Sequence, residues 1–98
     1  MLRTYKSLLL AAVLVFQPVA GFAGCYADYK AKKDKPLRLH YGVVALPETN
    51  CNDKAAVTAA ISNRIAKEKW TLLNVLGVFD ESGLNDRRDS AGDFFLRY

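Results

Sequence analysis

The sequence predicts a small α+β domain in which an antiparallel sheet of about three strands packs against one helix, in the chain order β-α-β-β. Three stretches carry this prediction. Residues 37–46 alternate in polarity with the period of two that is typical of a half-buried strand. Residues 53–69 are rich in alanine and have an apolar stripe at helical spacing, which indicates a helix. Residues 70–79 are apolar on both alternating sides, which indicates a strand buried on both faces.

The first 25 residues have the three-part layout of a secretory signal peptide. A basic start precedes the nine-residue apolar run 8–16, and small residues end the segment just before Cys25. The run is too short for a transmembrane helix, which needs about 20 apolar residues. We therefore expect a cleaved signal peptide over residues 1–23 and a single domain over residues 24–98 that is secreted into the periplasm.

The two cysteines of the chain, Cys25 and Cys51, leave two interpretations open. In the first they form a disulfide, which suits an oxidising compartment and leaves no thiol over. Closing that loop would stabilise so small a domain by roughly 3 kcal/mol. In the second, residues 22–25 resemble the lipobox of bacterial lipoproteins, so that Cys25 carries a membrane-anchoring lipid and Cys51 stays a lone thiol. Cysteine parity favours the disulfide.

Residues 37–46 lie between Pro36 and Pro47, which suit the entrance and the turn-rich exit of a strand. The alternation predicts that the odd-numbered residues from Leu37 to Val43 face the core. His40 is the only histidine of the chain, and the same alternation places it on the solvent face.

The predicted helix begins after Asn52 or Asp53, either of which can cap its N-terminus. Val57, Ile61 and Ile65 fall on one stripe that can bury against the sheet. The two lysines of its last turn complement the negative end of the helix dipole.

We expect residues 70–79 to form the central strand, because both of their alternating sides are apolar. One helix can cover only one face of it. The other face must then meet the lysine-rich N-terminal segment, another subunit or a partner protein. The candidate interface residues are apolar or aromatic: Trp70, Leu72, Leu76, Val78, Tyr26 and Tyr29.

The C-terminal part of the chain completes the predicted sheet. Residues 81–92 are expected to form a polar loop, with at most a helical turn over residues 85–89. Residues 94–98 are expected to form a closing strand that pairs antiparallel with the central one.

Basic residues gather in one stretch, residues 30–38. The formal net charge of +4 falls to about +2 without the signal peptide, so the overall charge says little about an anionic partner. The local cluster is a candidate contact for acidic lipid headgroups, for cell-wall polymers or for the acidic face of a partner. Export argues against a nucleic-acid partner. The candidate anion-contact residues are Lys30, Lys32, Lys33, Lys35 and Arg38.

The common catalytic motifs are absent from the sequence: it has no glycine-rich phosphate loop, no Cys-x-x-Cys, no His-Glu-x-x-His and no Gly-x-Ser-x-Gly. A zinc or copper site at His40 would need Cys25, Cys51 or a nearby carboxylate, and a nucleophile pair would need His40 with Cys51; the disulfide removes both thiols. The sequence therefore predicts a non-catalytic protein with no metal and no cofactor.

The order of elements, with Trp70 at the junction from helix to strand, resembles a family of small domains of unknown function. The signature of that family is Gly-Trp-Glu-Leu-Val followed by a returning strand. The matching stretch is 70–75, and Lys69 stands where the family has glycine. Four segments also resemble small uncharacterised secreted proteins of Gram-negative bacteria: 25–30, 37–43, 70–79 and 94–98. The resemblance implies the fold and the export, and it assigns no catalytic residue.

From these observations we expect an exported, non-catalytic module that mediates protein–protein interaction or self-association in the cell envelope. This expectation depends on the apolar strand 70–79. The alternative is an envelope protein or lipoprotein that binds a ligand, either peptidoglycan or anionic lipid, through its lysine cluster. That alternative depends on the basic stretch 30–38.

Overall fold

The structure is a computed structural model and describes residues 23–98. In that range the elements confirm the predicted α+β class with a three-stranded antiparallel sheet. The predicted signal peptide lies outside the described residues, apart from Ala23. The strands are β1 (Cys25–Lys33), β2 (Arg38–Leu46) and β3 (Thr71–Phe79), and the helices are α2 (Lys54–Ala66) and α3 (Leu84–Ala91). Short 3-10 turns lie at Glu48–Asn50, Glu81–Gly83 and Gly92–Phe94.

The central strand of the sheet is β1, which corrects the prediction that residues 70–79 lie at the centre. β1 pairs antiparallel with both β2 and β3, so the sheet order is β2-β1-β3 and β3 is an edge strand. The chain order is therefore β-β-α-β-α instead of β-α-β-β. Residues 25–33 carry too many alanines and lysines to predict a strand from β-propensity alone.

β3 is apolar along both sides because two bulges change its register, and not because it is buried twice. Leu72, Val75 and Val78 all lie opposite odd-numbered residues of β1, so a spacing of three replaces the usual spacing of two. The extra residues, Leu73 and Leu76, have no partner in the ladder with β1 and stay about half exposed. The strand itself is confirmed, whereas its expected alternation is wrong.

The segment after β3 corrects two further predictions. α3 occupies most of the stretch that was expected to be a polar loop. Residues 94–98 do not pair with the central strand: Phe95 makes one parallel bridge to Val43, and the Leu96 amide donates to the Val43 carbonyl at 2.8 Å. Gly92 and Leu96 have positive φ angles, of 54° and 55°, so the tail bends too often to continue as a strand.

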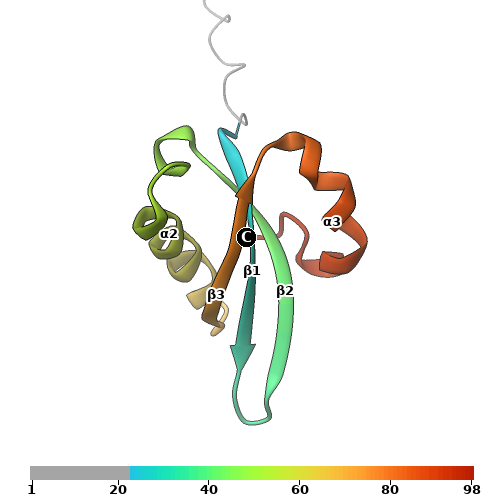
Figure 1. The fold of residues 1–98 in the computed structure, drawn as a ribbon. Coiled ribbons are helices and arrows are strands. Elements are labelled where there is room, and N and C mark those ends of the chain that lie inside the picture. The colour runs from blue at the N-terminus through green and yellow to red at the C-terminus, as the bar shows by residue number, and fades with distance from the viewer. Residues whose placement is uncertain (1–22) are drawn as a thin grey trace, which may run out of the picture.

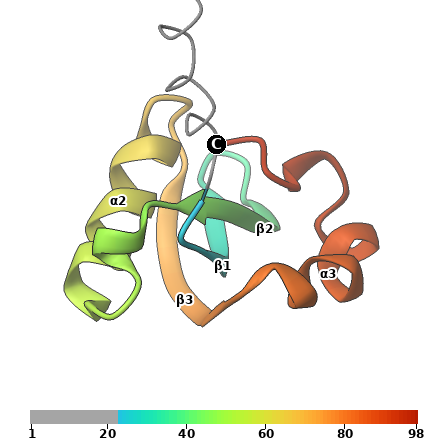
Figure 2. The same ribbon diagram turned by 90° about the horizontal axis from the view of Figure 1, so that it is seen from above.

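α2 and α3 lie on opposite faces of the sheet, as Figures 1 and 2 show. α3 packs on β2 and so covers part of the second face of the sheet. The expectation that another subunit or a partner meets the other side of residues 70–79 stays a prediction, because the sheet contacts of α3 are mainly with β2. The hairpin end of β1 and β2 extends past both helices (Figure 1).

The core lies between α2 and the sheet. Val57, Ile61 and Ile65 are buried, as the helical stripe predicts. Asp53 caps the helix, and its side chain accepts a hydrogen bond from the Ala56 amide at 3.1 Å. The helix ends earlier than predicted. Its stripe packs against odd-numbered residues of β1 and even-numbered residues of β2: Ala27, Tyr29, Ala31, Val44 and Leu46.

A buried ion pair ties α3 to the other face of the sheet. Asp28 of β1 is only 7% exposed. Its Oδ2 accepts hydrogen bonds from Arg87 Nε at 3.0 Å and from the Tyr41 hydroxyl at 2.8 Å. These donors offset part of the cost of burying the carboxylate, whose other oxygen, Oδ1, has no hydrogen-bond partner among the described residues.

Gly42 of β2 leaves room for the ring of Tyr29, since a Cβ at position 42 would lie 2.5 Å from the Tyr29 hydroxyl oxygen. Gly42→Ala should therefore lower the free energy of unfolding, measured by urea denaturation, by about 1–3 kcal/mol. Gly77→Ala is the matched control, because its Cβ would lie 3.7 Å from the nearest atom, Asp28 Oδ1. The control should change stability by no more than about 0.5 kcal/mol. Equal losses in the two variants would contradict the packing of Tyr29 over Gly42.

Candidate functional site

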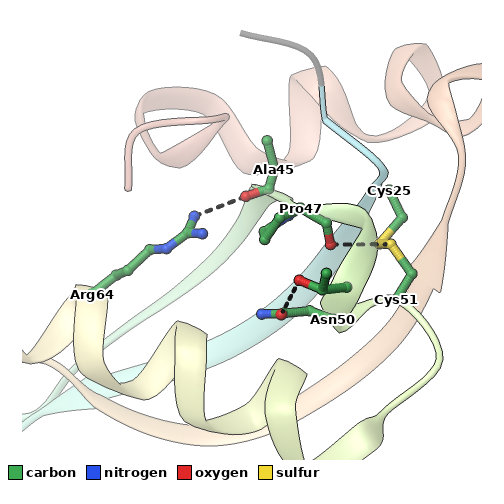
Figure 3. Close-up of a disulfide and its surroundings, with 7 residues drawn as sticks. Cys25, Ala45, Pro47, Asn50, Cys51 and Arg64 are labelled. Carbon is green, nitrogen blue, oxygen red and sulfur yellow. Dashed lines mark hydrogen bonds between the residues drawn. A yellow bond between two sulfur atoms is a disulfide. The ribbon is translucent and has the colours of Figure 1, made fainter. Parts of the chain in front are cut away.

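The disulfide Cys25–Cys51 joins the start of β1 to the loop that leads into α2 (Figure 3). It confirms the predicted pairing, and it contradicts the lipidated alternative because a disulfide-bonded Cys25 has no thiol to carry a lipid. The bond closes a sequence separation of 26, for which chain entropy predicts a stabilisation of about 3.5 kcal/mol. Near the disulfide, Arg64 of α2 donates to the Ala45 carbonyl at 2.8 Å (Figure 3). These two contacts hold α2 to both β1 and β2.

A groove lies between the first turn of α2 and β3, next to the disulfide. Its volume is about 300 Å³, which suits one or two apolar side chains better than a large ligand. Val57 and Val75 give it an apolar lining, and Leu76 and Val78 stay 47% and 44% exposed at its side. The other lining residues come from the loop before α2, from its first residue and from β3: Cys51, Asn52, Lys54 and Gly77.

The outer edge of β3 is open, since no other strand within residues 23–98 pairs with it. Its nine residues include no charged residue and no proline, two of the features that commonly protect an edge strand. Bulges can also protect an edge, but here they leave Leu73 and Leu76 exposed to solvent. An exposed apolar edge of this kind is typical of a surface that binds another chain.

The opposite edge of the sheet is partly closed. The Val43 carbonyl of β2 accepts a hydrogen bond from the Leu96 amide, and the Ala45 carbonyl accepts one from the Arg64 guanidinium, each at 2.8 Å. The C-terminal tail and α2 therefore occupy part of the β2 edge. Of the two edges, β3 is the one available to another chain.

Only part of the predicted interface set lies at this edge. Leu76 and Val78 flank the groove, whereas Leu72 is half-buried against the core. Tyr26 is half-buried as well, with its ring stacked on the last residue of β3 at a centroid distance of 6.1 Å. Two members of the set belong to the core and contribute no exposed surface: Trp70 and Tyr29.

Leu73 is an exposed residue of β3 that the predicted set does not contain. A signal for it exists in the sequence. The apolar doublets Leu72-Leu73 and Val75-Leu76 break strict alternation, and each doublet includes one of the two bulged residues.

The predicted anion-contact residues are divided between the two faces of the hairpin. Lys30 and Lys32 lie on the α3 side of β1, by the alternation of the strand from Asp28. Lys33 and Arg38 lie over the Trp70 ring on the other side, 4.6 and 5.6 Å from its centroid. The fifth residue is exposed in the turn between the strands: Lys35. The cations thus surround the hairpin end and do not form one flat patch.

His40 is buried, which corrects its predicted place on the solvent face. Its ring stacks on Phe94 with a centroid distance of 3.7 Å and meets Trp70 edge-on at 4.2 Å. Its Nε2 lies 2.9 Å from the Tyr29 hydroxyl oxygen. At this end of β2 the buried and exposed sides are exchanged relative to the prediction. The C-terminal tail covers His40, while Leu39 remains exposed.

Burial, together with the charges of Lys33 and Arg97, lowers the pKa of His40 to about 4. The imidazole is therefore neutral at pH 7, and its Nδ1 has no hydrogen-bond partner in the described part of the chain. Burial also raises the pKa of the Tyr29 hydroxyl above its ordinary value. Aromatic rings pack around the imidazole, and His40 also lines a shallow cavity together with Leu39 and Tyr41. The Tyr29–His40 pair is therefore a buried polar contact at the margin of the core.

Within residues 23–98, no three histidine, cysteine, aspartate or glutamate side chains gather as a metal site would require. Neither α2 nor α3, the helices of that range, has the length and apolarity of a membrane span. Comparison of the chain with protein-family models, with curated proteins and with solved structures finds no match. The resemblance to the Gly-Trp-Glu-Leu-Val domains and to secreted proteins of Gram-negative bacteria therefore stays a prediction.

The lowered pKa of His40 makes stability depend on pH. The unfolded chain takes up a proton at His40 near pH 6.5, and the folded chain does so only near pH 4. The unfolded state therefore binds more protons in this window, and the free energy of unfolding should fall by about 3 kcal/mol as the pH is lowered through it. Urea denaturation at a series of pH values measures this change.

The double variant Tyr29→Phe/His40→Phe is the control, because it removes the titrating group together with its hydrogen-bond partner. Its stability should change less than that of the wild type over the same pH range. If both proteins lose stability equally as the pH falls, His40 is not the buried neutral group described above.

Proposed function

We propose that this chain is an exported, non-catalytic module that binds another protein chain along the β3 edge. The observation that carries the proposal is the exposed pair Leu76 and Val78 on an uncharged edge strand, beside an apolar groove. Apolar side chains that stay exposed next to unpaired strand backbone favour contact with a second chain.

An extended segment of the partner would lie along β3 and place one or two apolar side chains in the groove. The bulges at Leu73 and Leu76 interrupt the edge, so the new backbone pairing is short. Apolar contact then supplies most of the binding free energy. Complete burial of Leu76 and Val78, which are each about half buried already, contributes about 1 kcal/mol apiece.

Two observations support an exported working place. The disulfide Cys25–Cys51 is of a kind that persists in oxidising compartments and is rare in the cytosol. The predicted signal peptide over residues 1–23 gives a route to such a compartment. We infer the periplasm as that compartment and the cell envelope as the source of the partner.

The variant Leu76→Lys places a charge on the open edge, and we expect it to weaken association at least about tenfold. Leu96→Lys is the matched control, because Leu96 is 42% exposed but lies in the C-terminal tail and not in β3. Sedimentation equilibrium over a range of concentrations measures self-association, and cross-linking from position 78, which lines the same groove, captures a different partner in envelope extracts. Both readouts should respond to Leu76→Lys and not to Leu96→Lys.

The proposal fails if the protein is monomeric at every concentration and no protein cross-links to position 78. It also fails if Leu96→Lys weakens association as much as Leu76→Lys does, since binding would then not depend on β3. Self-association with no other captured protein would identify the partner as a second copy of the chain.

A further inference from the structure

The β1–β2 hairpin extends past both helices and carries exposed apolar side chains at its end (Figure 1). Leu37 and Leu39 are 64% and 66% exposed, which makes them the most exposed large apolar residues in the described part of the chain. Leu73, turned out by its bulge, is 50% exposed. It lines a shallow cavity of about 290 Å³ together with Leu39 and Tyr41. Neither helix reaches this end of the sheet, so the fold does not use these leucines.

The same hairpin concentrates positive charge. Residues 30–39 contain five basic residues and one acidic residue, whereas the rest of residues 23–98 contains seven basic and nine acidic residues. Asp34, the one acidic residue, neutralises Lys32 through an ion pair at 3.2 Å. The other cations surround the hairpin on both faces and at its turn. The molecule is therefore polarised, with a basic hairpin on a slightly acidic body.

Apolar side chains that are surrounded by cations match the chemistry of an anionic lipid bilayer. The interface of an anionic bilayer offers negative phosphates to the lysines and an apolar layer just beneath them to the leucines. A glycan polymer would use the cations but has no apolar layer for Leu37 and Leu39. An acidic protein could also bind the cations, but it would need a complementary pocket for the exposed leucines. A bilayer needs no such pocket, because the projecting hairpin can insert Leu37 and Leu39 directly.

The geometry points to a second binding surface in this protein: the β1–β2 hairpin docks on anionic phospholipid, with Leu37 and Leu39 in the interface and the surrounding cations on the headgroups. This surface is separate from the β3 groove, because it lies at the other end of the sheet from the disulfide. The inference stands whether or not the β3 edge binds a protein.

Co-sedimentation with lipid vesicles tests the inference. The full protein should bind vesicles that contain phosphatidylglycerol, bind pure phosphatidylcholine vesicles far more weakly, and lose affinity as the salt concentration rises. Intact mass establishes the N-terminus of the preparation. All variants share that N-terminus, so differences among them report on the hairpin alone.

Two double variants separate the apolar and the charged contributions. Leu37→Asn/Leu39→Asn should weaken partition onto phosphatidylglycerol vesicles about tenfold. Lys30→Gln/Lys35→Gln should weaken it about twenty-fivefold, because each lysine near an anionic surface contributes about fivefold. The control Leu76→Asn changes a leucine that is 47% exposed on the β3 groove and should leave the partition unchanged.

Several outcomes would overturn the inference. One is the absence of vesicle binding at low salt, and another is binding to purified peptidoglycan in place of vesicles, which would assign the cations to a cell-wall polymer. A third is an equal loss of binding in Leu76→Asn, which would show that the hairpin is not the contact. Urea denaturation of each variant confirms that it is folded before binding is compared.

Discussion

Burial of the first half of β1 on both of its faces is the constraint on which the rest of the structure depends. The strand presents Ala27 and Tyr29 to α2 and Asp28 to α3, so each side needs its own helix. The chain supplies one helix before β3 and the other after it. The disulfide at Cys25 holds one end of β1 against the start of α2, and Arg87 holds Asp28 against α3. Because β1 also pairs with both other strands, these contacts position the whole sheet.

Local patterns in the sequence were enough to predict α2, β2, β3 and the disulfide, because alanine content, an N-cap, alternation and cysteine parity are properties of neighbouring residues. These local patterns do not predict β1, because its alanines and lysines are typical of a solvated segment. Its strand structure depends on pairing with β2 and β3, which local patterns do not show. The burial of His40 depends on Phe94, which comes from a distant part of the chain. At the candidate site, the sequence predicts the exposed residues Leu76 and Val78. It does not distinguish them from the buried Trp70, because the bulges of β3 break the alternation that would show which side chains face the core.

The two helices that cover β1 do not bury all of the apolar surface of the sheet. Two short helices cover the sheet at the disulfide end, and the open β3 edge and the projecting hairpin remain uncovered by the described residues. The two surfaces differ in charge, and this difference separates their partners. β3 has no charged residue, which favours a protein segment, whereas the hairpin surrounds its leucines with cations, which favours an anionic bilayer. A protein bound at one surface would leave the other accessible.

Residue-resolved amide hydrogen exchange on the monomeric protein tests the account most directly, because it shows which strand is central and which edge is open. We expect the slowest exchange for the amides of Ala27, Asp28 and Tyr29, which are buried residues of β1 between two paired strands. We expect fast exchange for the amides of β3 that point away from β1, since no described strand pairs with them. Amides along the outer edge of β3 that exchange as slowly as those of β1 would contradict both the sheet order and the open edge.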